Sequence, residues 1–267
     1  MTLITDQAYL QSEQYSTSAN LAARMELHRR FSTNHYGFSR WVFEQMSFAP
    51  NTQLLEVGCG PGTLWRENAD RLPNHLQLHL GDFSVGMTRE ARQSIHQNES
   101  FAFANLDVQA LPFPSHYFDV VIANHMLYHV PDLPRGVREL ARVLKPGGRL
   151  YAATNGVNHL REMHALIHEF EPRCIFHVES RISFRLENAA AILGQEFATV
   201  EIYRYPDGLW VTEVEPLINY IFSLWDYLEV LKPERAKALA DFLQDKIKTA
   251  GGISITKDAG LAIGFPS

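Results

Sequence analysis

Three glycines after a short apolar run are the residues whose types and spacing say most about chemistry. Residues 54–62 read Leu-Leu-Glu-Val-Gly-Cys-Gly-Pro-Gly, which predicts a buried strand that runs into a tight turn. Gly58, Gly60 and Gly62 can adopt backbone conformations closed to other residues and lack a Cβ, so a ligand can lie against the main chain. Glu56 places a carboxylate beside the turn, which would repel a pyrophosphate and suits a cation. The pattern favours a nucleotide-like ligand over a simple packing joint.

A second acid follows about twenty residues later. Residues 75–82 read His-Leu-Gln-Leu-His-Leu-Gly-Asp, which predicts a second strand that ends in Asp82. An acid at this position in a doubly wound sheet can accept two hydrogen bonds from the vicinal hydroxyls of a ribose. The alternative is that Asp82 only caps the next helix. Its distance from the glycine turn favours the ribose.

Three more features follow in order along the chain. Residues 101–108 predict a third strand with Asp107 near its end, and residues 111–124 predict a proline-marked loop and a fourth strand that ends at Asn124. Residues 144–154 begin Leu-Lys-Pro-Gly-Gly, which predicts the end of a helix and the start of a fifth strand. Strands alternating with helices are typical of a parallel sheet with helices on both faces.

The order and spacing of these features across residues 51–155 resemble those of class I S-adenosylmethionine-dependent methyltransferases. The glycine turn matches E-x-G-x-G-x-G, and the stretch from Asp107 is close to D-x-x-x-L-P-F-x-x-x-x-F-D-x-V. The resemblance is closest to the small-molecule branch of methyltransferase type 11, which includes ubiquinone and menaquinone C-methyltransferases. It implies S-adenosylmethionine as the cofactor, with S-adenosylhomocysteine as the product.

The resemblance also implies roles for single residues. Asp107 would accept a hydrogen bond from the adenine amine, the Val108 amide would bind a ring nitrogen, and Asn124 would lie under the methionine end. Phe83 and Met87 would flank the adenine, although such residues near a helix start are more often core. The predicted cofactor-binding residues are Glu56, Gly58, Cys59, Gly60, Asp82, Phe83, Met87, Asp107, Val108 and Asn124.

Histidines directly after the fourth predicted strand are the candidates for a catalytic base. His129 and His125 lie where ligands of open α/β sheets bind, and histidine titrates near neutral pH. Phosphoethanolamine-type methyltransferases have a functional histidine at the position that aligns with His129, working with a lid tyrosine, for which Tyr15 is the counterpart here. A buried structural histidine is the alternative for His129. The pair is not expected to bind a metal, because no carboxylate or thiol completes a site.

The elements around these residues predict an α/β fold. We expect a Rossmann-like, seven-stranded, mostly parallel sheet with an antiparallel last strand, an N-terminal helical lid and a helical cap inserted before the last strand. The expected divisions are residues 1–50 for the lid, 51–206 for the cofactor-binding core, with 156–185 contributing to the cap, 207–252 for the cap insertion and 253–267 for the closing strand. Aromatic residues of the insertion, among them Trp210, Tyr220, Phe222, Trp225 and Tyr227, are expected to form the cap core and partly to line a substrate pocket.

Composition excludes several classes of partner. The net charge of −6 argues against nucleic acid, and the arginines at 24, 29 and 30 are spaced like a solvated helix surface. No run approaches the ~20 apolar residues that a membrane span needs, and the N-terminus lacks a leader pattern. With two cysteines, Cys59 and Cys174, the chain is expected to be cytoplasmic.

The sequence therefore predicts a methyltransferase that acts on an O, N or C atom of a small, partly apolar metabolite. One alternative is a binding or scaffold protein that has lost catalysis. Another is a tRNA or protein methyltransferase, although the stretch after the fourth strand reads Asn-His-Met-Leu rather than an amine-acceptor motif. The aromatic cap could instead be a homodimer surface.

Overall fold

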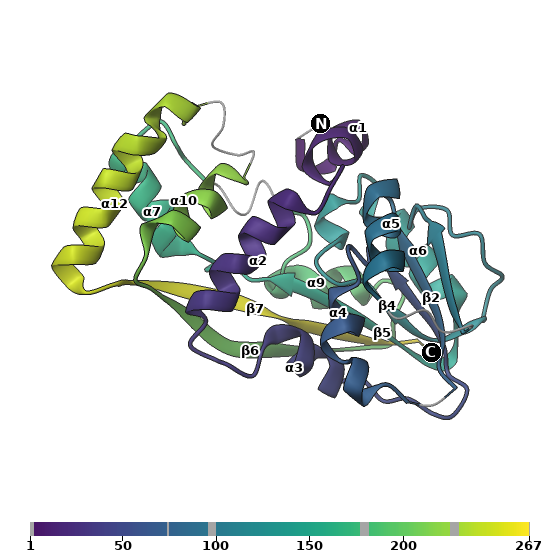
Figure 1. Cartoon of the computed structure of the whole chain (residues 1–267). Coiled ribbons are helices and arrows are strands. Elements are labelled where there is room, and N and C mark those ends of the chain that lie inside the picture. Colours follow the sequence, from purple (N-terminus) through teal and green to yellow (C-terminus); the bar gives the residue numbers. More distant parts are fainter. Residues whose placement is uncertain (1–2, 74, 96–99, 177–181, 225–229, 267) are drawn as a thin grey trace.

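A seven-stranded sheet in the order β3-β2-β1-β4-β5-β7-β6 organises the chain (Figure 1). The neighbours from β3 to β5 pair in parallel, whereas β7 runs antiparallel to both β5 and β6. The strands are β1 Gln53–Val57, β2 Gln77–Asp82, β3 Phe101–Asn105, β4 Phe118–Ile122, β5 Leu144–Asn155, β6 Thr199–Val211 and β7 Ile253–Phe265. The predicted fold class is confirmed.

The computed structural model describes residues 3–73, 75–95, 100–176, 182–224 and 230–266. Two of the predicted cap aromatics, Trp225 and Tyr227, lie outside the described residues. The helices of the N-terminal half are α1 Gln7–Tyr9, α2 Ala19–Phe31, α3 Phe38–Glu44, α4 Thr63–Glu67 and α5 Val85–Ser94. The helices of the C-terminal half are α6 Leu133–Val143, α7 Arg161–Phe170, α9 Leu186–Leu193, α10 Val214–Phe222 and α12 Ala236–Ala250.

Both faces of the sheet are buried, which explains the continuous apolar runs of its strands. Because side chains alternate along a strand, Leu55 packs with α6 and α9 on one face. Its neighbour Leu54 packs with Trp65 of α4 and Ala91 of α5 on the other face. These two layers fix the carboxyl ends of β1, β2 and β4 relative to one another.

A separate apolar cluster forms the cap at one end of the molecule. Strand β6 continues to Val211, so residues 207–211 belong to the sheet and the helical insertion follows them. Helices α7, α10 and α12 gather beyond the ends of β6 and β7 (Figure 1). The N-terminal helix α2 joins this cluster through Leu27 and Phe31, so the lid and cap pack as one unit.

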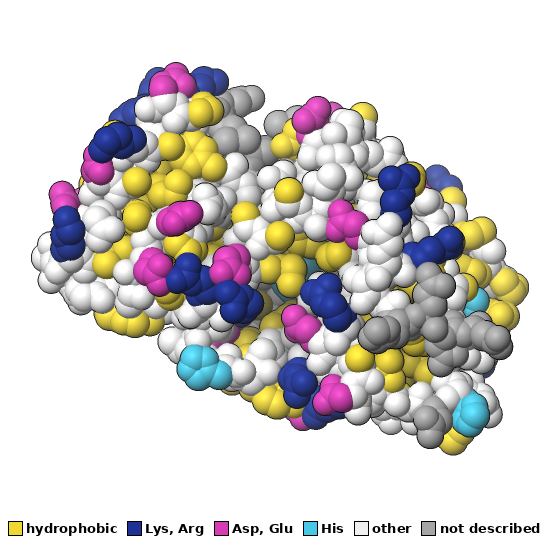
Figure 2. Space-filling view, in the orientation of Figure 1, with side chains coloured by type: hydrophobic (Ala, Val, Ile, Leu, Met, Phe, Trp, Pro, Cys, Tyr) yellow, Lys and Arg dark blue, Asp and Glu magenta, His cyan; other side chains and the backbone are white. Residues whose placement is uncertain are grey.

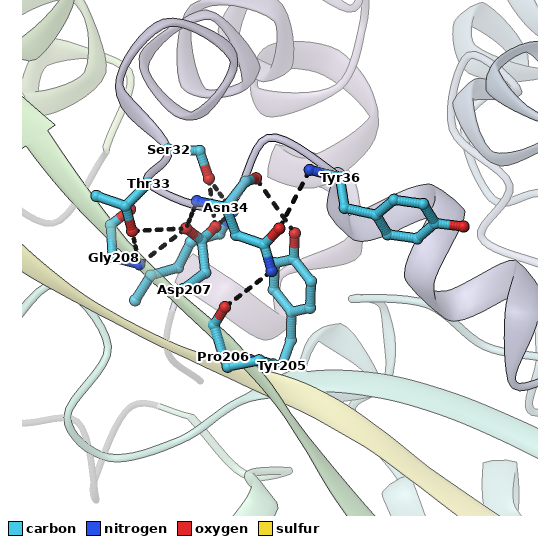
Figure 3. A network of polar contacts seen from close by, with 9 residues as sticks. Ser32, Thr33, Asn34, Tyr36, Tyr205, Pro206, Asp207 and Gly208 are labelled. Carbon is cyan, nitrogen blue, oxygen red and sulfur yellow. Dashed lines mark hydrogen bonds and ion pairs between the residues drawn. The ribbon is translucent and has the colours of Figure 1, made fainter.

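A buried ion pair holds the end of α2 against the sheet. Asp207 of β6 and Lys257 of β7 approach to 2.7 Å, and their side chains are 0% and 9% exposed. Figure 3 shows Ser32, Thr33 and Asn34 converging on Asp207; Ser32 Oγ donates to its carboxylate, and the Asn34 amide donates at 2.9 Å. This junction sets the position from which the N-terminal segment crosses the core.

Candidate functional site

A cavity of about 1190 Å³ lies at the carboxyl ends of the parallel strands and continues under α2 and the cap. Every residue that the sequence analysis assigned to the cofactor or to catalysis lines this cavity. They are Tyr15, Glu56, Gly58, Cys59, Gly60, Asp82, Phe83, Met87, Asp107, Val108, Asn124, His125 and His129. Residues from five separate stretches of the chain are therefore brought to one place.

The glycine turn has the backbone that its sequence predicts. Gly58 and Gly62 have φ angles of +73° and +76°, in the region that favours glycine. A Cβ on Gly58 would lie 2.7 Å from the Met126 side chain, and one on Gly62 would lie 2.5 Å from Ile95 Cδ1. The turn can thus lie against neighbouring segments and still leave its main chain facing the cavity.

Glu56 is buried beneath the turn, where its exposed fraction is 2%. Burial raises the pKa of Glu56 to about 8. A hydrogen bond from Trp65 lowers this pKa, whereas the negative charge of nearby Asp82 raises it further. Trp65 Nε1 donates to Glu56 Oε2 at 2.5 Å. The carboxyl group is mostly protonated at neutral pH in the ligand-free protein, and a cationic ligand beside it would favour ionisation.

Asp82 connects the glycine turn to helix α5. Its Oδ2 accepts from the Gly60 amide at 2.9 Å and its Oδ1 from the Ser84 amide at 2.8 Å. Burial raises the pKa of Asp82, and the hydrogen bonds from backbone amides only partly offset this increase. The cap of α5 is Ser84, whose hydroxyl accepts from the Met87 amide. Each oxygen of Asp82 keeps a second lone pair, which fits a ribose diol.

Asn124 and Asp107 both line the cavity and have free or partly used hydrogen-bond acceptors. Asn124 Oδ1 is buried and has no hydrogen-bond partner among the described residues. An acceptor in this state suits an ammonium group. Asp107 accepts from the Gln109 amide at 2.9 Å and from Gln7 Nε2 at 3.4 Å, so its carboxylate already binds amide donors of the kind an adenine amine offers.

Tyr15 and His129 meet inside the cavity, although 114 residues separate them in the sequence. His129 Nδ1 lies 2.8 Å from the Ile4 carbonyl oxygen, which can only accept, so Nδ1 carries the proton. Nε2 therefore has a free lone pair, and the Tyr15 hydroxyl donates to it at 3.1 Å. Burial lowers the pKa of His129 to about 4, so the imidazole is neutral at pH 7.

His125 lies apart from this pair. It has a φ of +51° and its ring centroid is 5.3 Å from that of Phe38. Burial, with help from Lys257, lowers its pKa to about 4. Among the described residues no group of three or more His, Cys, Asp or Glu side chains could hold a metal ion.

Several residues that the sequence analysis did not assign also line the cavity. They are Gln7, Gln11, Arg24, His28, His159 and Lys257. The interpretation of Arg24 as part of a solvated helix surface was wrong, because α2 turns that side chain toward the cavity. The spacing of Arg24 and His28, four residues apart, shows that they share a helix face but not that this face is buried.

Comparisons with known proteins agree with this geometry. The model of a methyltransferase domain family matches residues 55–152. A ubiquinone/menaquinone biosynthesis C-methyltransferase of Geotalea daltonii is 31% identical over 114 residues, which are 42% of this chain and 48% of that protein. The chain thus spans about half the length of this relative.

Solved structures share the fold at low identity. Phosphoethanolamine N-methyltransferase 2 of Haemonchus contortus, solved with S-adenosyl-L-methionine, superposes with a TM-score of 0.60 at 18% identity. The match covers 100% of this chain and 61% of that one. A Haloferax volcanii methyltransferase solved with the Trm112 methyltransferase activator gives a TM-score of 0.54 at 19% identity, over 95% and 97% of the two chains.

The family assignment follows from the matched region and the fold. The match begins in β1 and ends in β5, so it contains the glycine turn, Asp82, Asp107 and Asn124. Members of the family use S-adenosylmethionine as methyl donor. Residues 55–152 match a methyltransferase domain, and this part of the chain is similar to class I S-adenosylmethionine-dependent methyltransferases.

Proposed function

We propose that the protein transfers a methyl group from S-adenosylmethionine to an O, N or C atom of a small, partly apolar metabolite. The observation that carries this proposal is the Tyr15–His129 pair, which shares one cavity with the glycine turn. Cavities that hold one small ligand measure about 300–1,000 Å³. A volume of about 1190 Å³ gives room for the cofactor and an acceptor together.

When bound, S-adenosylmethionine supplies an electrophilic methyl group on a sulfonium whose positive charge disappears in the transfer. The task of the protein is to align the acceptor with that methyl group, exclude water and remove a proton from the acceptor where one must leave. Tyr15 can accept a proton from an acceptor O–H or N–H at its oxygen while its own hydroxyl proton passes to His129 Nε2. The Nδ1 hydrogen bond to Ile4 keeps His129 in the tautomer that this transfer needs.

The N-terminal segment is proposed to act as the lid. Gln7 bonds to Asp107, Gln11 bonds to the Phe83 carbonyl, and the Tyr15 carbonyl accepts from Ser84 at 2.7 Å. These contacts span the region assigned to the adenosine, so entry of the cofactor requires the segment to move. Lids of this kind exclude water during the reaction.

A small acceptor is favoured over a nucleic acid. The described face in Figure 2 has basic and acidic side chains interspersed rather than one basic patch. The net charge of −6 disfavours the electrostatic attraction on which nucleic-acid binding depends. Among the described residues, no helix has the length and apolar character needed to cross a membrane.

Methyl transfer is tested by incubating the protein with methyl-tritiated S-adenosylmethionine and pooled small-metabolite fractions. We expect label to enter one fraction, and we expect Tyr15→Phe to lower the rate about 100-fold or more, as general-base catalysis typically requires. Tyr117→Phe is the matched control, since Tyr117 is exposed and lies outside the cavity. Equal rates for Tyr15→Phe and the parent would exclude the pair from catalysis. S-adenosylhomocysteine binding without transfer to any fraction would favour the binding-protein alternative.

A further inference from the structure

Arg24 is a buried cation whose counter-charge does not appear among the described residues. It lies on α2 and lines the cavity, its Nε donates to the Asn20 carbonyl at 3.3 Å, and its Nη2 is buried with no partner. The next arginines of the helix differ, because Arg29 pairs with Glu26 and Arg30 pairs with Glu213. Arg24 forms no ion pair with any carboxylate in the part of the chain that the structure describes.

The side chains around Arg24 preserve its charge without neutralising it. Its Cζ lies 5.5 Å from the centre of the Tyr15 ring. Burial opposes the charge, but Tyr15, Tyr220 and Tyr128 raise the pKa of Arg24 above its usual value. A guanidinium that stays charged in a buried site is costly unless an anion accompanies it.

Two neutral histidines beside Arg24 complete a polar site on the cap side of the cavity. His28 lies one turn further along α2, and its ring is 6.1 Å from that of His159 and 5.7 Å from that of Tyr220. Nδ1 of His28 and Nδ1 of His159 are both buried without a described partner. Burial lowers the pKa of both rings, against a hydrogen bond to the Asp258 backbone in the case of His159, so both rings are uncharged. A neutral His28 can donate one hydrogen bond from Nδ1.

Lys257 does not share this role, because Asp207 neutralises it at 2.7 Å. This half of the cavity also has apolar residues in its wall, Leu160, Phe176 and Leu224, with His164 stacked on Phe176. A ligand that fits both kinds of wall has an apolar body and one anionic group.

Building on the proposed methyl transfer, we propose that the methyl acceptor carries a carboxylate or phosphate group and that Arg24 binds this anion. We favour an anion of the methyl acceptor over the methionyl carboxylate of the cofactor because of where the neighbours of Arg24 lie. His28 belongs to α2, Tyr220 to α10, and His159 to the loop before α7. These elements form the cap, and none of them belongs to the stretch from 55 to 152 that matches the methyltransferase domain.

The position of Arg24 also links acceptor binding to the base. The charge of Arg24 is one of the causes that lower the pKa of His129, after burial. An anion on Arg24 would offset that effect and make His129 a better proton acceptor.

Calorimetry on protein saturated with S-adenosylhomocysteine tests this assignment with phenylacetate, phenyl phosphate and neutral phenylacetamide. We expect the parent to bind at least one anion about tenfold or more tightly than the amide, and the tighter anion identifies the group. Arg24→Gln should abolish this preference and Arg24→Lys should keep part of it. Arg30→Gln, the same change on the same helix outside the cavity, should leave the preference unchanged.

Other outcomes overturn the assignment. Equal affinity of the parent for the anions and the amide, or no binding of any of the three, would show that the cavity does not select an anion. If Arg24→Gln weakens S-adenosylhomocysteine but not methylthioadenosine, which lacks the carboxylate, Arg24 binds the cofactor instead. Failure of the parent to bind S-adenosylhomocysteine at all would reject the proposed function itself, which is a separate result.

Discussion

At the scale of single residues, the protonation state of Glu56 is set by its surroundings. The folded protein keeps this side chain buried against Trp65, which raises its pKa from 4.5 to about 8. Between these two values the group holds its proton in the folded state and loses it in the unfolded state. The free energy of unfolding therefore falls as the pH rises through this window.

Glu56→Gln should remove that pH dependence. Glutamine can still accept the hydrogen bond from Trp65 but cannot ionise, so the variant should gain stability over the parent by more than about 2 kcal/mol between pH 5 and pH 8. Urea unfolding of ligand-free protein at both pH values measures this. Glu67→Gln, an exposed neighbour, should show no such trend, and parallel pH profiles for Glu56→Gln and the parent would contradict the account.

Residue types explain what the sequence could and could not reveal about the site. Gly58, Asp82 and Asn124 could be predicted because turns and strand ends have local sequence patterns. Tyr15 could be matched to His129 only through a family resemblance, since the contact between them depends on how the N-terminal segment crosses the core. Arg24 was misassigned because a helix pattern shows which residues share a face, whereas packing against α10 decides which face is buried.

At the scale of elements, the N-terminal segment of residues 4–18 buries the apolar side chains of Ile4 and Leu10 and forms several hydrogen bonds to the core. Ile4 and Tyr15 bond to His129, and the Ser18 amide donates to Glu90 at 3.1 Å. Segments with few apolar contacts open at low free-energy cost. The segment should therefore respond to ligands in the cavity beneath it.

Hydrogen exchange should detect this response. Amides of residues 4–18 should exchange about tenfold more slowly when S-adenosylhomocysteine is bound, because the ligand adds contacts that only the closed segment completes. Amides of α6, whose residues do not line the cavity, serve as the internal control. Protection restricted to the glycine turn would contradict a lid role for the segment.

The Asp207–Lys257 pair joins α2 to the last two strands. Asp207→Asn would leave the Lys257 ammonium buried without a counter-charge, so the free energy of unfolding should fall by about 3–5 kcal/mol. Glu213→Gln, which breaks the exposed pair with Arg30, should change it by less than about 1 kcal/mol. Chemical unfolding at pH 7 measures both, and similar effects for the two variants would show that the buried pair does not fix the junction.

At the scale of the whole molecule, the histidines of the cavity should control the response to acid. Burial lowers the pKa of His28, His125, His129, His159 and His164, with His125, His129 and His164 at about 4 and His159 at about 3. The unfolded chain binds these protons near pH 6.5 and the folded protein does not. Stability present at pH 7 is therefore lost as the pH falls toward 4.

The free energy of unfolding should drop by at least about 2 kcal/mol between pH 7 and pH 5, despite the opposite trend from Glu56. His159→Gln should reduce this drop, whereas substitution of exposed His116 should not. Urea unfolding curves at the two pH values measure the difference. Equal stability at pH 7 and pH 5 would show that the histidines are not held neutral.

The general architecture could be predicted from the sequence because strand and helix periods, proline-glycine breaks and the glycine turn are local features. The boundary of the cap was misplaced, because β6 continues to Val211 through Pro206 and Gly208, two residue types that usually end strands. These residues are tolerated on an edge strand, where pairing with β7 and contacts from the end of α2 hold them. The packing of α2 with α10 likewise depends on tertiary contacts that have no local signal.

The central claim is that the cavity binds S-adenosylmethionine through the residues that the sequence identified. Calorimetric titration with S-adenosylhomocysteine tests it most directly, using the parent, Asp82→Asn and the exposed control Asp70→Asn. We predict one-site binding by the parent and the control, with affinity lowered about tenfold or more in Asp82→Asn, as the loss of a charged hydrogen-bond acceptor implies. No saturable binding by the folded parent, or equal binding by Asp82→Asn, would contradict the account.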